Sequence, residues 1–437
     1  MNVPVPAPTD PARWRVLIFP GGTEIGLEIR EALQWSKEVT IHSAGSGGST
    51  HAPYAFRDHT VVPPVGQPGW LEALQEVVRR EGITHVFPAH DDALVALAEH
   101  AGAFRPAKIV TSPLATCQIT RSKLQTRRLL EGVVPTPLLY PGIAEVPTYP
   151  VFLKPDRGQG SQRTDRAEDA TMLSELLARD PDRAIWEFLP GEEYTIDCFS
   201  DRERGLLHAS GRERVRIRAG IAMHSRRVDL PCFADYARRI ASVLPLHGAW
   251  FFQVKRNQRG ELVVLEVAPR VGGTSALSRV HGVNLPLLSL YEAERQPVSI
   301  LPGFHRVEID RALRNRYRHD LSFQAVYCDY DDTLVVRDRL NVDAIRFLYQ
   351  CVDRGIRVVL ITRHRGNLEQ ELQRRRLRGL FDEVIHLQSG EAKAGFIRER
   401  PALFIDDSFA ERSAVGRLAG VHVADPGMME MLIDERA

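Results

Sequence analysis

Short apolar runs alternate with longer amphipathic stretches over the first 114 residues. Strand-like runs lie at 16–19, 39–41, 86–87 and 109–110, and stretches of helical pattern lie between them at 25–33, 70–80 and 94–100. Strands that alternate with helices at this spacing predict a parallel, doubly wound sheet. We therefore expect residues 1–114 to form an α/β domain with a Rossmann-like sheet.

The pattern changes in the middle of the chain. Residues 115–309 contain strand-like runs of more antiparallel character, such as 194–199 and 261–266, and they indicate an α+β domain. Residues 310–321 form a predicted linker between domains. This linker contains the arginines Arg311, Arg314, Arg316 and Arg318. We interpret it as a solvated connector, and a phosphate-binding patch is the alternative.

Alternation of strands and helices returns over residues 322–437. Apolar runs at 326–328, 357–361 and 403–405 predict strands, and 342–354 predicts a helix. We expect a third domain here, again built on a parallel sheet. The full chain has 437 residues. This exceeds the roughly 250–300 residues at which a single hydrophobic core stops growing, so a multidomain protein is expected.

Composition narrows the range of partners. The 57 basic and 56 acidic side chains leave a formal net charge of +1, which argues against a dedicated nucleic-acid or membrane-surface binder. Five scattered cysteines form no Cys-x-x-Cys motif, as is typical of buried thiols in a reducing compartment. No apolar stretch reaches membrane-spanning length, and we expect a cytoplasmic protein.

Candidate chemistry is concentrated in the third predicted domain. Asp329 and Asp331 follow a strand-like run and are two residues apart, so on an extended segment their carboxylates share a face. One can act as nucleophile and the other as proton donor, as phosphoryl transfer through an aspartyl-phosphate requires. Thr362, Lys393 and the pair Asp406-Asp407 follow later, and Thr362 and Asp406-Asp407 each end a predicted strand.

These four segments, in this order, resemble the haloacid dehalogenase (HAD) superfamily over residues 329–407. The resemblance implies a Mg²⁺-dependent phosphatase in which Asp329 attacks phosphorus and Asp331 protonates the leaving oxygen. Thr362 and Lys393 would bind the phosphoryl oxygens. The implied metal ligands are carboxylates: Asp329, Asp331, Asp406 and Asp407. Intervals 333–362 and 362–393 are too short for the cap domain that many HAD enzymes carry, so we expect a capless phosphatase.

The middle domain contains a second set of short motifs. Lys123 begins a helical run, Lys154 ends a strand, and a small-residue loop at 156–161 could fold its N–H groups over phosphates. Gln253 and Glu266 end adjacent strands. Together with 185–194 and 269–274, these motifs resemble the ATP-grasp superfamily over about residues 16–290, and most closely one synthetase half of the carbamoyl phosphate synthetase large chain.

The ATP-grasp resemblance implies a role for each matching residue. Lys123 and Lys154 would contact the ATP phosphates, and Arg270 would lie near the transferred phosphoryl group. The implied lid contains Gly158, Gly160 and Ser161. The implied adenine and ribose contacts are Glu187, Phe188, Leu189 and Glu193. The implied Mg²⁺ ligands, with Mn²⁺ as the alternative ion, are Gln253 and Glu266.

Two positions depart from the ATP-grasp pattern. Ser122 precedes the first lysine, where the superfamily usually has an acidic residue. Ala268 stands where the asparagine of the metal-binding Glu-x-Asn pair is expected, and a methyl group cannot bind a metal. The second departure is the more serious one, because it removes one ligand of the second Mg²⁺.

Two further motifs could bind the acceptor substrate. The segment 21–26 follows a strand and opens a helix, so it could hold an anion, although a tight turn is an equal explanation. On a strand, Arg212, Arg214, Arg216 and Arg218 would share one face. A solvated edge strand is the default interpretation, and a surface for a phosphorylated or carboxylated substrate is the alternative.

The sequence thus predicts a bifunctional enzyme. An ADP-forming ligase would join a small-molecule carboxylate to an amine through an acyl phosphate, and a fused HAD phosphatase would act on a phosphate ester. No nucleic-acid or membrane partner is expected, and a homodimer is one expectation because ATP-grasp relatives often form dimers. The alternative is a catalytically weak ATP sensor that regulates the phosphatase. A phosphatase for nucleic-acid ends is a third, less favoured hypothesis.

Overall fold

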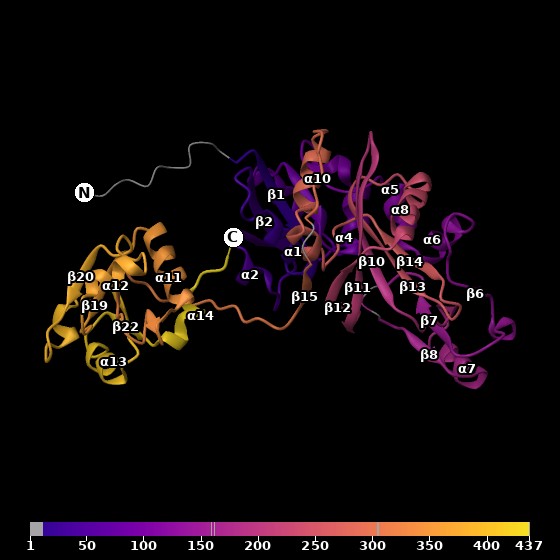
Figure 1. The fold of residues 1–437 in the computed structure, drawn as a ribbon. Helices are drawn as coiled ribbons and strands as arrows, with labels where there is room; N and C mark the ends of the chain where they lie inside the picture. Colours follow the sequence, from indigo (N-terminus) through magenta and orange to yellow (C-terminus); the bar gives the residue numbers. More distant parts are fainter. Residues whose placement is uncertain (1–11, 159, 161, 304–305, 437) are drawn as a thin grey trace. The chain divides into compact units, whose positions relative to one another are not determined.

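The protein is described by a computed structural model that covers residues 12–158, 160, 162–303 and 306–436. The chain divides into two compact units, one ending at Leu313 and the other spanning Arg314–Arg436 (Figure 1). Among the residues covered, no helix is both long and apolar enough to cross a membrane.

The first unit begins with a parallel five-stranded sheet in the order β3-β2-β1-β4-β5. Its strands are β1 (Trp14–Phe19), β2 (Val39–Gly45), β3 (His59–Val61), β4 (His85–Pro88) and β5 (Lys108–Ile109). Its helices are α1 (Glu24–Leu33), α2 (Ala52–Ala55), α3 (Trp70–Arg80) and α4 (Asp91–Glu99). The predicted parallel sheet is therefore confirmed.

The central strand β1 explains why this sheet forms. Val16 and Ile18 pack into one hydrophobic cluster, and Leu17 and Phe19 pack into another on the opposite face. Side chains that alternate between two buried faces require an almost continuous apolar strand, as the run 16–19 provides. Thr23 then caps α1 by accepting a hydrogen bond from the N–H of Gly26.

A small antiparallel sheet follows two short helices, α5 (Leu114–Arg121) and α6 (Lys123–Leu130). Its order is β6-β9-β7-β8. The strands are β6 (Leu139–Tyr140), β7 (Val151–Pro155), β8 (Asp165–Ala167) and β9 (Arg183–Glu187), and α7 (Ala170–Arg179) packs against them.

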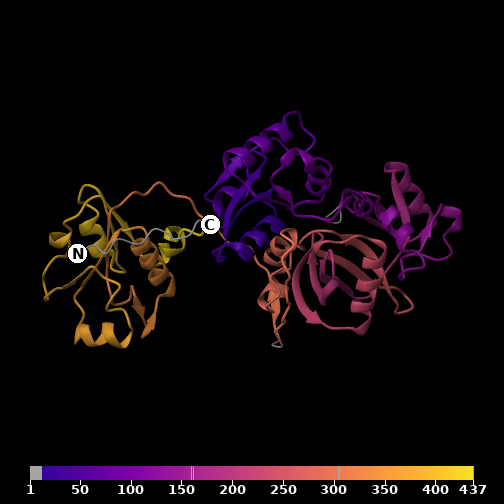
Figure 2. The ribbon, with the colours of Figure 1, turned by 90° about the horizontal axis from the view of Figure 1, so that it is seen from above.

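A larger antiparallel sheet completes the first unit, in the order β14-β13-β10-β11-β12-β15. Figure 2 shows the ribbon of the first unit from a second direction. The strands are β10 (Glu193–Asp201), β11 (Gly205–Arg218), β12 (Ile221–Val228), β13 (Gly248–Arg256), β14 (Leu262–Ala268) and β15 (Glu308–Asp310). The helices are α8 (Pro231–Val243), α9 (Ala276–Val280) and α10 (Leu285–Ala293). The start of the predicted linker lies in this sheet, because Asp310 pairs with β12.

This sheet corrects the interpretation of the arginine-rich strand. β11 has a partner on each side, β10 and β12, so it is not an edge strand. The register with β12 shifts on either side of Arg216, so Arg212, Arg214, Arg216 and Arg218 do not keep one regular face. Arg212 is buried and Arg216 and Arg218 are exposed. The sequence predicted a single face because we assumed regular alternation of side chains, and alternation breaks down where a strand contains β-bulges.

The second unit is a parallel five-stranded sheet in the order β20-β19-β16-β21-β22. The strands are β16 (Ala325–Cys328), β19 (Arg357–Thr362), β20 (Glu383–His386), β21 (Ala402–Ile405) and β22 (Val421–Ala424). Residues of α11 (Val342–Asp353), α12 (Leu368–Arg374) and α14 (Met429–Leu432) pack in one core cluster. α13 (Phe409–Val415) contributes to the other core cluster.

The connections of this second sheet are short. Between Thr333 and Thr362 the chain forms only a small hairpin of β17 (Val335–Val336) and β18 (Arg339–Leu340), then α11 and β19. Between Thr362 and Lys393 it forms α12 and β20. All residues of both intervals are described, and neither contains an inserted domain, as the sequence predicted.

Candidate active sites

A cavity of about 370 Å³ lies in the first unit and is lined from both antiparallel sheets. It brings together sequence-predicted nucleotide and metal residues: Lys123, Lys154, Gly158, Gly160, Glu187, Phe188, Leu189, Glu193, Gln253 and Glu266. Ser161 lies outside the described residues. The elements that carry these side chains are far apart in sequence, so their convergence is a product of the fold.

Two lysines supply positive charge to this cavity. Lys154 lies one residue before the end of β7, and its ammonium lies 4.4 Å from the centre of the Trp186 ring. Burial, reinforced by the neighbouring Lys123, lowers the pKa of Lys154 to about 8. Burial also lowers the pKa of Lys123, whose ammonium donates to the carbonyl of Gly158 at 3.1 Å. Both lysines therefore favour the binding of an anion, because a nearby negative charge would offset the free energy that it costs to bury their positive charges.

An acidic side chain reaches the start of α6 from elsewhere in the chain. The Asp156 carboxylate accepts a hydrogen bond from the Ser122 hydroxyl at 2.8 Å and another from the N–H of Leu124 at 2.9 Å. Ser122 stands where the ATP-grasp pattern usually has an acidic residue. A carboxylate thus lies beside that position, although it comes from the loop after β7.

Two side chains with oxygen atoms that suit a divalent cation lie on neighbouring strands of the large sheet. They do not end these strands as the sequence predicted, because β13 continues to Arg256 and β14 to Ala268. Gln253 and Glu266 are directly opposite each other on β13 and β14, so their side chains lie on one face. Carboxylate and amide oxygens suit Mg²⁺, which usually completes its coordination with phosphates and water. Ala268 is buried two residues after Glu266 and offers no ligand. The residues present therefore fit one divalent metal ion, which Gln253 and Glu266 would hold.

Arg270 does not line the first cavity. Its guanidinium forms a two-point ion pair with Asp91 at the start of α4, at 2.6 and 2.9 Å, and stacks near the Phe251 ring. Burial alone would raise the pKa of Asp91, but Arg270 holds it below its usual value. Sequence reasoning missed Asp91, because the two partners are 179 residues apart.

A second cavity of about 480 Å³ adjoins the first. The two cavities share several lining residues, among them Arg214, Gln253 and Glu266. The second cavity extends to residues that the first does not reach: Gly22, Thr23, Glu24, Arg212, Arg270, Thr274 and Arg311. Both acceptor motifs singled out in the sequence, 21–26 and the arginine-rich strand, therefore contribute to this one cavity.

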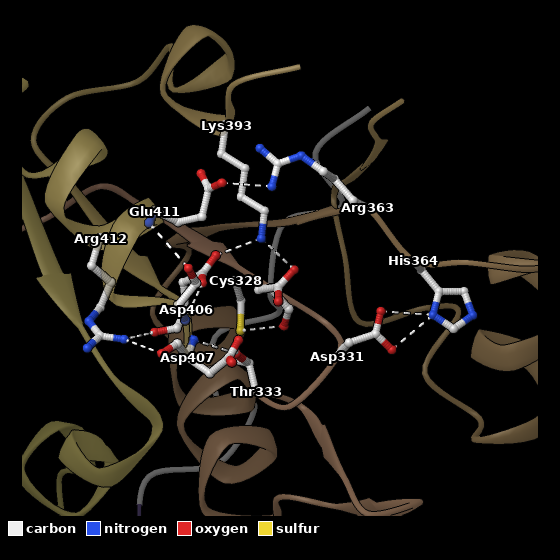
Figure 3. Close-up of polar contacts among 12 residues, drawn as sticks. Cys328, Asp331, Thr333, Arg363, His364, Lys393, Asp406, Asp407, Glu411 and Arg412 are labelled. Carbon is white, nitrogen blue, oxygen red and sulfur yellow. Dashed lines mark hydrogen bonds and ion pairs between the residues drawn. The ribbon is translucent and has the colours of Figure 1, made fainter. Parts of the chain in front are cut away.

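The second unit contains a compact cluster of charged residues (Figure 3). The ammonium of Lys393 lies 2.7 Å from Oδ1 of Asp329 and 2.6 Å from Oδ2 of Asp406. Asp329 follows β16 and Asp406 follows β21, and these strands are neighbours in the parallel sheet. Burial raises the pKa of Asp329 to about 6, against the opposing effect of Lys393.

Three carboxylates in this cluster could hold a metal ion. Oxygens of Asp329, Asp406 and Asp407 lie within 4.8 Å of one another. The N–H of Asp407 donates to the Thr333 hydroxyl at 3.0 Å, which fixes the loop after β21. Three carboxylates facing one ammonium leave an excess of negative charge, which fits a hard divalent cation such as Mg²⁺.

Asp331 is placed differently from the expectation. It is half exposed and does not belong to the carboxylate cluster; its oxygens lie 3.0 Å from Nδ1 of His364. Figure 3 shows it turned toward His364 and away from Lys393. The predicted convergence of Asp329 and Asp331 on one group is therefore not the arrangement seen. Thr362 is buried at the end of β19, two residues before His364.

Comparisons with known proteins address the first unit. Residues 179–312 match a family model described as ATP-grasp in the biosynthetic pathway with Ter operon. The chain is 30% identical to a D-alanine–D-alanine ligase of Marinomonas sp. (strain MWYL1) over 38% of its own length and 60% of that protein. The chain thus spans about three fifths of this curated relative.

Two solved structures share the fold. An L-amino acid ligase from Bacillus licheniformis has a TM-score of 0.53 at 17% identity, covering 67% of this chain and 78% of that one. An N5-carboxyaminoimidazole synthetase from Staphylococcus aureus, complexed with ADP, has a TM-score of 0.53 at 14% identity, covering 66% and 80%. These similarities support an ATP-grasp domain. The closer likeness to carbamoyl phosphate synthetase stays a prediction.

Proposed function

We propose that this chain, which contains an ATP-grasp domain, is a bifunctional enzyme. The first unit would be an ADP-forming ligase that activates a small-molecule carboxylate and joins it to an amine or a similar nucleophile. The second unit would be a Mg²⁺-dependent phosphatase acting through an aspartyl-phosphate. The observation that carries the ligase is the pair of adjoining cavities, one suited to ATP and one to an acceptor.

The first cavity has the charge that nucleotide binding needs. Lys123 and Lys154 would bind the ATP phosphates. The backbone of residues 187–189 would bind adenine, and Glu193 would bind the ribose. A divalent ion bound by Gln253 and Glu266 would neutralise charge on the phosphates. The related D-alanine–D-alanine ligase and the L-amino acid ligase of the same fold are both named as ligases, which supports this choice of reaction.

The proposed ligase reaction has two steps. The acceptor carboxylate attacks the γ-phosphorus of ATP, giving an acyl phosphate and ADP, and a nucleophile then displaces phosphate. Negative charge develops on the transferred group in both steps. Arg270, fixed by Asp91, and the two lysines would stabilise this charge as preorganised cations. A site closed to water would protect the acyl phosphate from hydrolysis.

The charged cluster of the second unit supports the phosphatase. Asp329 would attack phosphorus, and Lys393, which touches its carboxylate, would neutralise the phosphoryl oxygens. A metal ion held by Asp329, Asp406 and Asp407 would balance the remaining negative charge. Asp331 would protonate the leaving group after its side chain turns from His364 toward the substrate. This rotation is needed because Asp331 points away from the cluster (Figure 3).

The ligase is tested by ADP release from the Asp329→Asn variant, supplied with Mg·ATP and pools of carboxylates and amines. The substitution removes the phosphatase nucleophile, so phosphate ester hydrolysis does not disturb the assay. ADP formed only with one carboxylate and amine pair would establish the ligase and identify its substrates. ATP binding with no ADP from any pool would refute it.

Ala268 favours one second candidate function, an ATP sensor that regulates the phosphatase. A site with fewer metal ligands can bind ATP yet transfer its phosphoryl group slowly. In that case ATP would change the rate of phosphatase turnover without being consumed. The same ADP assay, run together with hydrolysis of a generic phosphate ester, separates the two candidates.

A further inference from the structure

The second cavity of the first unit is lined by four arginines that differ in their partners. Arg212 is buried and paired with Asp197, with Nε and Oδ2 2.9 Å apart, and Arg270 is paired with Asp91. Arg214 lies 3.1 Å from Glu193. Each of these three guanidinium groups is therefore balanced by a carboxylate of the protein itself. Their positive charges are therefore partly compensated before any ligand binds.

Arg311 is the exception among the four. Its guanidinium donates a hydrogen bond to the Thr274 hydroxyl at 3.4 Å, and it forms no ion pair with the residues that the structure describes. Its main chain is fixed, because its N–H donates to the carbonyl of Met223 at 2.7 Å and so continues the pairing of β15. Glu28, a neighbouring acid, is already paired with Arg279 at 3.0 Å.

A second observation indicates a polar ligand in this cavity. Thr195 lines it and is only 1% exposed, yet its hydroxyl has no hydrogen-bond partner among the described residues. Thr195 lies on β10 between Arg212 on β11 and Gln253 on β13. A buried hydroxyl without a partner costs free energy, and a bound polar group would remove that cost.

The two ends of the cavity have different neighbours. Gln253 and Glu266 also line the nucleotide cavity, so this end would meet the γ-phosphate of ATP. Thr274, Arg311 and the start of α1 line only the second cavity, so they belong to the part of it that the nucleotide cavity does not share. An acceptor with its reacting carboxylate near Gln253 would extend toward Arg311.

We propose that the acceptor carries a second anionic group, a carboxylate or a phosphate, and that Arg311 binds it. The inference rests on the proposed ligase function and narrows it to dianionic acceptors. A guanidinium that lacks a carboxylate partner and borders a cavity is suited to a charge-assisted, two-point contact with such a group. Arg311 would therefore determine specificity and would take no part in phosphoryl transfer.

Glu24, in the same cavity, would suit an acceptor with a positively charged group in place of a second negative one. It lines the cavity at the start of α1 and is exposed. A zwitterionic acceptor could place an ammonium group against this carboxylate. We favour the dianion because Arg311 is fixed by main-chain pairing and Glu24 is exposed to solvent, where a charge contact is weak.

The test is calorimetric binding to the full chain saturated with Mg²⁺ and the non-hydrolysable ATP analogue AMP-PNP. Three acids of equal length separate the possibilities: succinate has a second carboxylate, butyrate has none, and 4-aminobutyrate has an ammonium group. Glutarate, valerate and 5-aminovalerate repeat the set one carbon longer. Comparing 3-phosphonopropionate with succinate distinguishes a phosphate-like group from a carboxylate.

Two substitutions of Arg311 test its proposed contact with the second anionic group of the acceptor. Arg311→Met removes the charge and keeps the length, and Arg311→Lys keeps the charge without the two-point geometry. The matched control is Arg216→Met, because Arg216 pairs with the adjacent Asp310 and does not line the cavity. Binding of AMP-PNP in the same titrations shows that each variant is folded and that the nucleotide site is intact.

We expect the wild type and Arg216→Met to bind a dianion at least about tenfold more tightly than its monoanionic partner. Arg311→Met should abolish this preference, and Arg311→Lys should retain part of it. Tighter binding of the ammonium acids, or no preference for a second negative charge, would overturn the proposal even if AMP-PNP binds. Failure to bind AMP-PNP would instead count against the ligase itself.

Discussion

Each unit places a lysine in its candidate site, but among the described residues only the lysine of the second unit, Lys393, forms ion pairs with carboxylates. Half-buried Lys154 has no ion pair with any described residue and lies over Trp186. Burial, together with Lys123, lowers its pKa to about 8. Burial alone would also lower the pKa of Lys393, yet contact with Asp329 and Asp406 raises it above its ordinary value.

This difference indicates what each site lacks. The first site has two lysines, Lys123 and Lys154, that form no ion pair with any described residue, so a polyphosphate would supply their missing partner. The second has more carboxylates than cations, so a divalent metal would complete it. The comparison therefore supports the proposed nucleotide site in one unit and the proposed metal-dependent phosphatase in the other, and it can be tested by changing each lysine and each ligand separately.

The largest expected effect is the loss of one activity without the other. Asp329→Asn should reduce hydrolysis of a generic phosphate ester by roughly a thousandfold or more, because it removes the attacking oxygen. Lys154→Met should leave that hydrolysis unchanged and weaken ATP binding by about tenfold or more. Hydrolysis is measured with p-nitrophenyl phosphate and binding by calorimetry. Loss of both functions in either folded variant would contradict separate sites.

Many of the charged residues in this comparison could be predicted from the sequence, because each lies in or directly after a short apolar run. Strands such as β16 and β21 are short apolar runs, and the residues that follow them, Asp329 and Asp406, must meet at one edge of a parallel sheet. Lys154 could also be placed from a short apolar run, although its strand β7 belongs to an antiparallel sheet.

What sequence could not supply were partners brought close only by tertiary packing. Asp91 forms an ion pair with Arg270 although the two are 179 residues apart in the sequence, and no local sequence pattern predicts that pairing. The pairing of Asp331 with His364 has the same origin, since the loop after β19 reaches it from another strand. The bulges beside Arg216 broke the period of two that the sequence analysis assumed.

The second prediction concerns stability and uses the two lysines as matched sites. Lys393→Met leaves Asp329 and Asp406 facing each other without a cation, which should destabilise the second unit by roughly 3–5 kcal/mol in EDTA. Lys154→Met should not destabilise the first unit. The folded pKa of Lys154 lies below its unfolded value, so below about pH 8 the charged lysine is less favourable in the folded state.

Urea unfolding of the full chain at pH 7 measures both effects, with tryptophan and circular dichroism signals followed together. Equal destabilisation by the two substitutions would show that the two lysines have similar surroundings. That result would remove the contrast between the sites.

The third prediction distinguishes the two sites by the ligand that stabilises each unit against unfolding. MgCl₂ alone should stabilise the second unit, by about 2.7 kcal/mol at a concentration 100 times the dissociation constant. Asp407→Asn should reduce this effect because it removes one of the three carboxylates. The first unit should respond to Mg²⁺ only when nucleotide is present, since Gln253 and Glu266 supply few ligands on their own. A thermal unfolding series with Mg²⁺, AMP-PNP and both would show this pattern.

The smallest expected effect is proton uptake when nucleotide binds to the first unit. At pH 9, Lys154 with a pKa of about 8 is mostly neutral, and phosphates placed beside it favour the charged form. Binding should therefore take up close to one proton at pH 9 and almost none at pH 7, where the lysine is already charged. For the same reason, affinity should fall as pH rises above 8, by up to about tenfold per pH unit.

Calorimetry of Mg·AMP-PNP binding in two buffers of different ionisation enthalpy gives the number of protons taken up. Lys154→Met should lose most of the uptake, with a small remainder from Lys123, whose pKa is also lowered by burial. Lys393→Met should keep it, because that lysine is already charged through its contacts with Asp329 and Asp406. Uptake that persists in Lys154→Met would place the titrating group elsewhere, and the contrast between the two lysines would no longer explain which unit binds the nucleotide.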